Sequence, residues 1–265
     1  MRNEALVGYL LHQRPYQEKR ALYYLFSQQH GVIHGIGKKG APLFEPLQLF
    51  ATGKRDLKTF TQINLVPVED SATDNAITKS ATDSNTNLDT KSLHYQKISG
   101  QQQYAALYLN EILWKLLPTE DPMPILWQHY QDSLLQLKQS LTAGQLRLCL
   151  RQFEYYLFQE LGFALTLDYD HLLAPIESSL DYRFSPDAGF IPVIQNHKSI
   201  QSDNAEISTS QTLFGGATII EMAQSGITKH TLAAFSQLHR QLIDHLLDYQ
   251  PLQSRLLWQQ QQRYQ

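Results

Sequence analysis

The sequence predicts an α+β, multi-domain protein: an N-terminal five-stranded β-barrel followed by an α-helical bundle domain. Residues 3–68 hold five short segments rich in Val, Ile, Leu, Phe and Tyr, separated by turn-like residues. Residues 69–100 are dominated by Ser, Thr, Asn and Asp, and residues 101–265 carry apolar residues at helical spacing. We therefore expect a barrel over 1–68, a flexible polar linker over 69–100 and a helical domain over 101–265.

The expected strands are EALVGYLLHQ, ALYYLFS, GVIHGIGK, LQLFA and LKTFTQINLVPV, and the turns between them are RPYQEK, QQHG, KKGAP and TGKRD. Five strands in about seventy residues favour a closed barrel of the oligonucleotide-binding (OB-fold) kind, because closure leaves no exposed sheet edge. The second segment also fits a short helix, since Leu22, Leu25 and Phe26 share a helical face.

Charge is distributed unevenly. Residues 1–68 hold nine Lys and Arg against four Asp and Glu, whereas the whole chain has a net charge of −3. A basic segment on an acidic chain is typical of a nucleic-acid-binding face, although a mixed, solvated surface fits as well. Barrels of this kind bind single strands with basic loops and aromatic side chains. The candidate DNA-binding residues are Arg14, Tyr16, Lys19, Arg20, Lys38, Lys39, Lys54, Arg55 and Lys58.

Three helices are expected over residues 101–163. The first ends at Pro118, and the second begins with Asp121 as N-cap and Pro122 as its first residue. The apolar face of this second helix is expected to contain Ile125, Leu126, Tyr130, Leu134 and Leu137. Short connections predict that the three helices pack as antiparallel neighbours.

The third helix, Leu146 to Phe163, has an apolar face and an arginine pair, and Gly162 ends it as the C′ residue. Its expected apolar face consists of Leu146, Leu150, Phe153, Leu157 and Leu161. Arg147 and Arg151 lie four residues apart on one side. Two interpretations stay open: a core helix with a solvated arginine pair, or a groove that binds an apolar peptide carrying a carboxylate.

After this helix, DYRFSPDAGFIPV predicts a small hairpin around 180–195 that turns at Ser185–Gly189. Asp168, Asp170 and His171 form an ordinary polar turn or, alternatively, the acid–base or metal cluster of a hydrolase. Residues 195–211 are expected to be a polar loop. Helices are expected at TIIEMAQ and at KHTLAAFSQLHRQLIDHLLDYQ, whose buried face runs from Leu232 to Tyr249, and the last residues are expected to be an amphipathic tail.

The single cysteine, Cys149, excludes a disulfide framework and a cysteine-cage zinc site, and it fits a cytoplasmic protein. No apolar run is long enough to span a bilayer, and the N-terminus does not have the pattern of a signal peptide. We find no hydroxyl or thiol nucleophile beside a plausible base, so we expect no catalytic residue and no enzyme activity.

The chain resembles the RecO family of bacterial recombination mediators. The resemblance rests on GYLLHQRPYQEKRALYYLFSQQHG, YLNEILWKLL, DPMPILWQHYQDSL, LRQFEYYLFQELGFAL and PLQSRLL, in this order along nearly the whole chain. It implies an OB-fold barrel and a helical domain. It also implies binding of single- and double-stranded DNA, annealing of complementary strands, and loading of recombinase onto strands coated by single-stranded DNA-binding protein. The implied partners are RecR and the C-terminal tail of single-stranded DNA-binding protein, and the implied location is the cytoplasm, at the nucleoid when active.

The resemblance also assigns a peptide site. Arg151 matches the arginine of the LRxFE motif, which is implicated in holding the tail of single-stranded DNA-binding protein. Arg147, Phe153 and Leu157 are the neighbouring candidates. Many relatives carry a four-cysteine zinc module where this chain has Leu167 to Asp170, so we expect no zinc and no other cofactor. The basic loop after the third strand is shortened to KKGAPLFEP.

The alternative to a DNA-binding mediator is a non-enzymatic interaction scaffold whose barrel binds protein. Binding to single-stranded DNA separates the two, because only contacts to phosphates produce a steep dependence on salt. Metal-dependent turnover distinguishes the hydrolase alternative.

Overall fold

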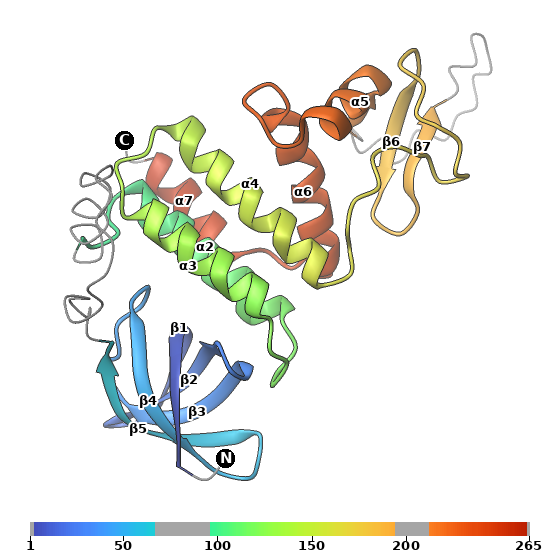
Figure 1. Ribbon diagram of the computed structural model, residues 1–265. Coiled ribbons are helices and arrows are strands. Elements are labelled where there is room, and N and C mark those ends of the chain that lie inside the picture. Colours follow the sequence, from blue (N-terminus) through green and yellow to red (C-terminus); the bar gives the residue numbers. More distant parts are fainter. Residues whose placement is uncertain (1–2, 67–95, 194–211, 264–265) are drawn as a thin grey trace, which may run out of the picture. The chain divides into compact units, whose positions relative to one another are not determined.

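The computed structural model describes residues 3–66, 96–193 and 212–263 (Figure 1). Its contacts group the chain into two compact units, residues 1–142 with 252–265, and residues 143–251. The polar loop expected at 195–211 and most of the linker expected at 69–100 lie outside the described residues. The barrel and part of the helical region share one unit, so a domain boundary at 69–100 stays a prediction.

The first unit contains the five-stranded barrel that the sequence predicts. Its strands close in the order β1-β2-β3-β5-β4, and β3 and β5 run parallel. The strand bounds are β1 Glu4–Gln17, β2 Arg20–Ser27, β3 Gly31–Lys38, β4 Pro46–Thr52 and β5 Leu57–Leu65. The second segment is therefore a strand, not a helix.

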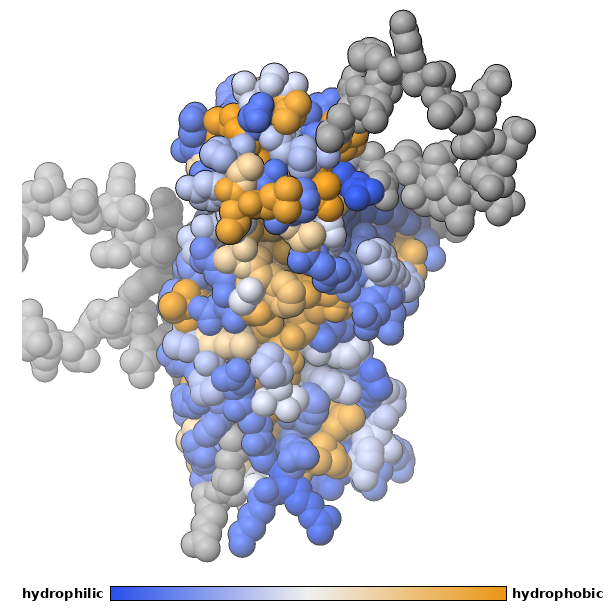
Figure 2. Space-filling model, turned by 90° about the vertical axis from the view of Figure 1, so that its right-hand side faces the viewer, coloured by the Kyte–Doolittle hydropathy of each residue, from blue (hydrophilic) through white to orange (hydrophobic). Residues whose placement is uncertain are grey.

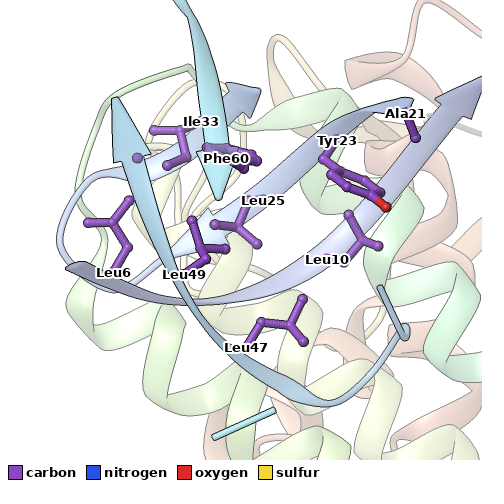
Figure 3. Close-up of a cluster of buried hydrophobic side chains, with 10 residues drawn as sticks. Leu6, Leu10, Ala21, Tyr23, Leu25, Ile33, Leu47, Leu49 and Phe60 are labelled. Carbon is purple, nitrogen blue, oxygen red and sulfur yellow. The ribbon is translucent and has the colours of Figure 1, made fainter. Parts of the chain in front are cut away.

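Side chains of alternate residues fill the barrel (Figure 3). On β2 the inward-facing residues are Ala21, Tyr23 and Leu25, and they pack against Ile33 of β3 and Phe60 of β5. Since side chains alternate along a strand, the residues between these face outward. The alternation therefore fixes which polar side chains the barrel presents on its outer surface.

The first strand is longer than predicted. β1 continues to Gln17 and pairs there with Arg20, so Arg14 and Tyr16 lie on a strand rather than in a turn. The polar composition and Pro15 made this stretch look like a turn. The pairing register shifts between Pro15 and Gln17, and proline is tolerated at such bulges because it has no N–H to donate.

Two helices follow the barrel within the first unit, α2 (Gln101–Leu116) and α3 (Pro124–Leu137). The predicted start of α3 is wrong: Met123 is the N-cap and Pro124 the first helical residue, because a residue before proline disfavours the helical conformation. The predicted buried face is also wrong at Ile125, which is 59% exposed, whereas Trp127 is buried.

Aromatic side chains join α3 to the outside of the barrel. Tyr9 of β1 lies 5.2 Å from Trp127 and 5.3 Å from Tyr130 between ring centroids, and Phe26 of β2 lies 5.3 Å from Trp127. All four side chains are buried. Tilted and edge-to-face pairs of this kind add to the free energy gained from burying apolar surface, so the barrel and α3 form one continuous packed interface.

A buried asparagine ties the same interface with hydrogen bonds. Asn110 of α2 donates from Nδ2 to the carbonyl oxygens of Leu10 and Leu11, each at 3.2 Å, and its Oδ1 accepts from the Tyr130 hydroxyl at 2.5 Å. The carbonyls lie beside the bulge in β1, where ladder pairing shifts. Burial raises the pKa of Tyr130 well above its usual range, so this hydroxyl remains a donor.

The C-terminal segment is a helix, α7 (Gln253–Gln262), and not only an amphipathic tail. It contacts α2, and the Glu111 carboxylate accepts hydrogen bonds from the backbone N–H groups of Gln253 and Ser254 at 2.9 and 2.8 Å. The Ser254 hydroxyl donates to the same carboxylate at 2.7 Å. Glu111 therefore caps α7 from a neighbouring helix, where the helix dipole also favours negative charge.

We predict that Glu111→Gln destabilises the protein by about 1.5 kcal/mol at neutral pH, because α7 loses its anionic cap. Burial alone would raise the pKa of Glu111, but the hydrogen bonds from Ser254 and Gln253 and the contact with Lys115 outweigh it, and the pKa is lowered. The stabilisation is therefore present above the unfolded value of about 4.3 and is lost as pH falls through the lower native value.

Urea denaturation of wild type and variant across this pH range measures the effect, with Glu18→Gln at an exposed position as the control. The difference in unfolding free energy should shrink on acidification. A difference that stays constant with pH would show that the carboxylate charge contributes nothing.

The second unit contains α4 (Ala143–Glu160), β6 (Asp181–Ser185), β7 (Gly189–Val193), β8 (Leu213–Gly215), α5 (Gly216–Ser225) and α6 (Leu232–Leu246). The predicted hairpin is confirmed: β6 pairs with β7, and Ser185 lies opposite Gly189. A third strand, β8, was not predicted. Because α4 belongs to this unit, packing of three neighbouring helices stays a prediction.

The end of α4 is as predicted. Gly162 has a φ of 79°, its N–H donates to the Gln159 carbonyl at 3.1 Å, and the Phe163 N–H donates to the Phe158 carbonyl at 2.8 Å. These two bonds form a Schellman motif, which requires a left-handed residue that glycine provides. The prediction that Tyr249 belongs to the buried face of α6 is wrong. Tyr249 comes after the end of this helix and is 73% exposed.

Candidate nucleic-acid interface and peptide site

The outer wall is the outward-facing surface of β1, β2 and β3. After the register shift between Leu10 and His12, His12 lies opposite Tyr24, and Tyr24 lies opposite His34. Further along the same strands, Arg14 lies opposite Leu22, and Arg20 lies opposite Lys38. Strand alternation therefore places aromatic residues in the middle of the wall and cations at one end.

Four of the predicted cations gather at the end of the β1–β2 hairpin. This hairpin-end cluster consists of Lys19, Arg20, Lys38 and Lys39, all exposed. The Lys39 N–H donates to the Lys19 carbonyl at 3.2 Å, and the Lys39 ammonium donates to the Glu18 carbonyl at 2.9 Å. Tyr16, 53% exposed, lies on the adjoining strand. These residues offer several positive charges to phosphates from one edge of the wall.

Lys54 and Arg55 form a second, separate basic group in the turn between β4 and β5, and both are exposed. Leu57 comes just after this turn and lies opposite His34 of β3. His34 is four residues from Lys38 on the same strand, and the rise of a strand makes the distance between these two residues roughly 13 Å. Apart from Arg14 and Lys58, the predicted cations thus form two groups on either side of the aromatic residues, not one cluster.

Lys58 is a correction to the predicted DNA-binding set. Its side chain is 5% exposed, its ammonium lies 2.5 Å from a Glu120 carboxylate oxygen, and it donates to the Arg55 carbonyl at 2.7 Å. β5 begins at Leu57, so alternation turns Lys58 to the same side as Phe60. A paired, buried ammonium is not available to a phosphate, so Lys58 does not belong to the proposed interface.

The middle of the wall carries a group that the sequence did not reveal, the aromatic cluster of His12, Arg14, Tyr24, His34 and Trp114. The His12 and Trp114 rings stack with centroids 4.8 Å apart and planes 15° apart. Tyr24 lies 5.4 Å from Trp114 and 4.4 Å from His34. The alternation along β2 and β3 indicates from the sequence that Tyr24 and His34 face outward. Trp114, by contrast, comes from α2 and reaches this cluster only through tertiary packing.

The charge of the aromatic cluster resides on Arg14. Burial lowers the pKa of His12, and the positive charge of Arg14 lowers it further, while burial also lowers the pKa of His34. The neutral form of both imidazoles is therefore favoured at pH 7. The Arg14 Cζ lies 5.7 Å from the Tyr24 centroid and 5.8 Å from the Trp114 centroid, within cation–π range.

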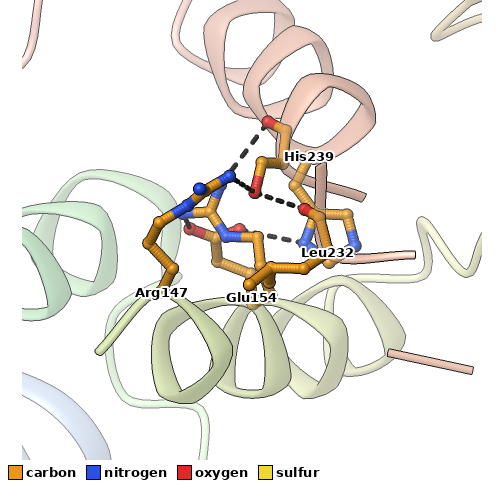
Figure 4. Close-up of polar contacts among 6 residues, drawn as sticks. Arg147, Glu154, Leu232 and His239 are labelled. Atoms are coloured by element: carbon orange, nitrogen blue, oxygen red, sulfur yellow. Dashed lines mark hydrogen bonds and ion pairs between the residues drawn. The ribbon is translucent and has the colours of Figure 1, made fainter. Parts of the chain in front are cut away.

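The predicted peptide site lies on α4 in the second unit (Figure 4). Arg151 contacts the Glu154 carboxylate at 2.5 Å, and the other Glu154 oxygen lies 2.9 Å from Nδ1 of His239 on α6. Both arginines also donate to Ser236: Arg151 donates to its carbonyl oxygen at 3.5 Å, and Arg147 donates to its hydroxyl oxygen at 3.4 Å. Glu154 and His239 are fully buried.

This geometry corrects the predicted peptide pocket in two ways. Phe153 and Leu157 are 1% and 0% exposed, so they belong to the core and do not line an open groove. Arg151 is mostly enclosed and compensates the buried charge of Glu154, as a buried carboxylate requires. Arg147 is exposed and is the arginine that solvent reaches most readily.

A hollow of about 310 Å³ lies elsewhere in the second unit, lined in part by Phe163, Asp170, His171 and Leu242. Asp170 Oδ1 accepts the N–H groups of Leu172 and Ala174 at 2.8 and 2.9 Å, as in a polar turn. Within the described residues, no three His, Cys, Asp or Glu side chains gather as a metal site requires.

Apolar residues also reach the surface (Figure 2, orange). Among the residues that the structure describes, Leu172 and Leu173 are the most exposed large hydrophobic residues, at 74% and 80%. Helices long and apolar enough to cross a membrane are absent from the described ranges.

The fold defines a class: a closed barrel of the oligonucleotide-binding type, followed by a helical region. A family model described as "Recombination protein O C terminal" matches residues 99–256. "DNA repair protein RecO" of Pseudomonas paraeruginosa is 33% identical, covering 96% of this chain and 94% of its own. The proteins of the same name from Stutzerimonas stutzeri and Tolumonas auensis are 32% and 31% identical, over 95% of this chain and 92% and 93% of theirs. The chain belongs to the RecO family.

Proposed function

We propose that this protein acts in DNA repair as a recombination mediator that binds single- and double-stranded DNA, anneals complementary strands and helps load recombinase onto coated single strands. Membership of the RecO family supports the repair role. The observation that carries the DNA-binding role is the outer wall, where an aromatic cluster lies between the hairpin-end cluster and the basic β4–β5 turn. Basic tracks with aromatic platforms bind single strands in this way.

No catalytic step is part of this proposal. Annealing needs two strands held close while their charges are screened, and cationic side chains supply that screening without bond making or breaking. We propose the bacterial cytoplasm as the location, with association at the nucleoid when the protein is bound to DNA. From the family resemblance we also propose RecR as a partner.

Annealing of complementary strands that are precoated with single-stranded DNA-binding protein tests the proposal. We expect the protein to accelerate annealing, and we expect less acceleration when the coating protein lacks its terminal peptide. Equal rates with and without this protein would contradict the mediator role. An interaction scaffold whose barrel binds protein would also show no salt-dependent binding to bare strands.

We further propose that the terminal carboxylate of that peptide binds at Arg147 and Arg151, since arginine binds carboxylates through paired N–H groups. The contacts of Arg151 with Glu154 and Ser236 hold its guanidinium in one orientation, which lowers the entropic cost of recognising a ligand. Phe153 and Leu157 support the helix from its buried side.

We predict that Arg151→Ala weakens binding of the terminal peptide at least tenfold and leaves DNA affinity unchanged. The same substitution destabilises the second unit by about 3 kcal/mol, because it removes the cation beside the buried Glu154. The double variant Arg151→Ala, Glu154→Gln removes that buried charge and should recover most of the stability without recovering peptide binding. Arg240→Ala, at an exposed position on α6, is the matched control.

Calorimetric titration with the peptide measures its affinity for each variant, and thermal denaturation measures the stability of each variant. If the double variant binds the peptide as tightly as wild type, the site lies elsewhere.

A further inference from the structure

Arg14 differs from the other predicted DNA-binding cations in its surroundings. The four cations of the hairpin-end cluster project from the end of a hairpin, and Lys54 and Arg55 project from a turn. The guanidinium carbon of Arg14, on β1, instead lies over two aromatic rings, those of Tyr24 and Trp114. Its Nε also lies 3.5 Å from Nε2 of His12, at the limit of a hydrogen bond.

These contacts place the guanidinium carbon within cation–π range of both rings. Tyr24 and Trp114 are partly buried, whereas Arg14 itself is exposed, so solvent reaches the Arg14 side chain. Because burial lowers the pKa of His12, the neutral form of this neighbour is favoured, so its Nε2 can accept from Arg14 and adds no second positive charge. The result is a planar, solvent-exposed cation beside two aromatic rings.

Resting on the proposed function, we infer that Arg14 is a base-stacking residue: an unpaired nucleobase stacks on its guanidinium, which Tyr24 and Trp114 support from beneath. Unstacked bases pack on arginine planes as well as on aromatic rings, and every base offers a π-face. A duplex keeps its bases stacked on one another, so this subsite takes single strands and exposed ends.

The position of Arg14 fits the path of a strand. Arg14 lies opposite Leu22 on β2, two residues from Arg20 of the hairpin-end cluster. Tyr24 and His34 continue the wall towards the basic β4–β5 turn. Phosphates that follow the two basic groups would therefore bring bases over the middle of the wall, where the aromatic cluster lies.

The simpler alternatives are that Arg14 contacts a phosphate, or that the aromatic cluster only fastens α2 to the barrel. Arg14→Lys separates these from stacking, because lysine keeps the positive charge and loses the planar guanidinium. The probes are a thymidine oligonucleotide and an abasic strand of equal length, which presents the same phosphates without bases. Fluorescence anisotropy at low salt gives both dissociation constants for each variant.

Wild type should bind the thymidine strand about tenfold more tightly than the abasic strand, the size expected for a stacked base. Arg14→Lys should bring this ratio close to one while abasic affinity stays unchanged. Lys38→Ala with Lys39→Ala should weaken both affinities together and keep the ratio. Trp114→Phe retains an aromatic support and should keep most of the ratio, whereas Trp114→Leu should lose it.

A ratio that survives Arg14→Lys would overturn the inference and leave DNA binding intact, as would equal affinity of wild type for the two strands. Failure of wild type to bind either strand would instead contradict the proposed function itself. Circular dichroism of each variant checks that α2 and the barrel remain folded.

Discussion

Reversing three charges, Lys38→Glu, Lys39→Glu and Arg55→Glu, is expected to lower the affinity for single-stranded DNA on the order of a hundredfold at low salt. The first two residues belong to the hairpin-end cluster and the third to the β4–β5 turn, so the substitutions remove cations on both sides of the aromatic cluster. Each phosphate contact that is lost also removes counterion release. The slope of log affinity against log salt should therefore become shallower by about 2 for a single strand.

The control carries the same change in net charge at exposed cations that belong neither to the barrel strands nor to their turns, Lys97→Glu, Lys229→Glu and Arg240→Glu. When the two triple variants are compared at moderate salt, the control should lose much less affinity, because charges that do not contact the strand are screened within about 10 Å. Equal losses in the two triple variants would mean that net charge governs binding and that the wall has no special role.

Replacing Asn110 with alanine is expected to lower the free energy of unfolding by about 4 kcal/mol. The substitution leaves the carbonyl groups of Leu10 and Leu11 and the Tyr130 hydroxyl without their amide partner in a buried interface. Each unsatisfied buried group costs about 1–3 kcal/mol, and the lost volume adds a cavity. Because the effect falls on the junction between β1, α2 and α3, the outer wall should lose its order with it.

Chemical denaturation measures this change, and Asn64→Ala provides the comparison. Asn64 also donates a side-chain hydrogen bond to a backbone carbonyl, at 3.2 Å, but from an exposed position on β5. We expect that control to change stability by less than about 0.5 kcal/mol. A small effect at Asn110 would indicate that water replaces the amide and that the interface depends mainly on its aromatic packing.

Local patterns predicted the parts of the fold that depend on local physics. The alternation along GVIHGIGK defines β3, Gly31–Lys38, without adjustment. Gly162 ends α4 because only a left-handed residue closes the Schellman motif there. The hairpin around Ser185–Gly189 follows from its turn residues.

Features that depend on tertiary contacts could not be predicted from local sequence patterns. Lys58 has the composition of a turn cation, but the start of β5 places it beside Glu120. Trp114 of α2 stacks on His12 of the barrel, a contact between distant parts of the sequence that no local spacing indicates. Arg151 was expected at an open groove, whereas Glu154 and Ser236 engage most of its guanidinium.

The central claim is that the cations and aromatic side chains of the outer wall bind single-stranded DNA. Ultraviolet crosslinking of the full chain to a thymidine oligonucleotide tests this claim most directly. Mass spectrometry of the crosslinked peptides would map each attachment. We predict that the attachments fall on β1 to β3 and on Trp114, and that excess unlabelled strand suppresses them. Attachments confined to residues 143–251, with none on the barrel, would contradict the assignment of this wall as the DNA-binding surface.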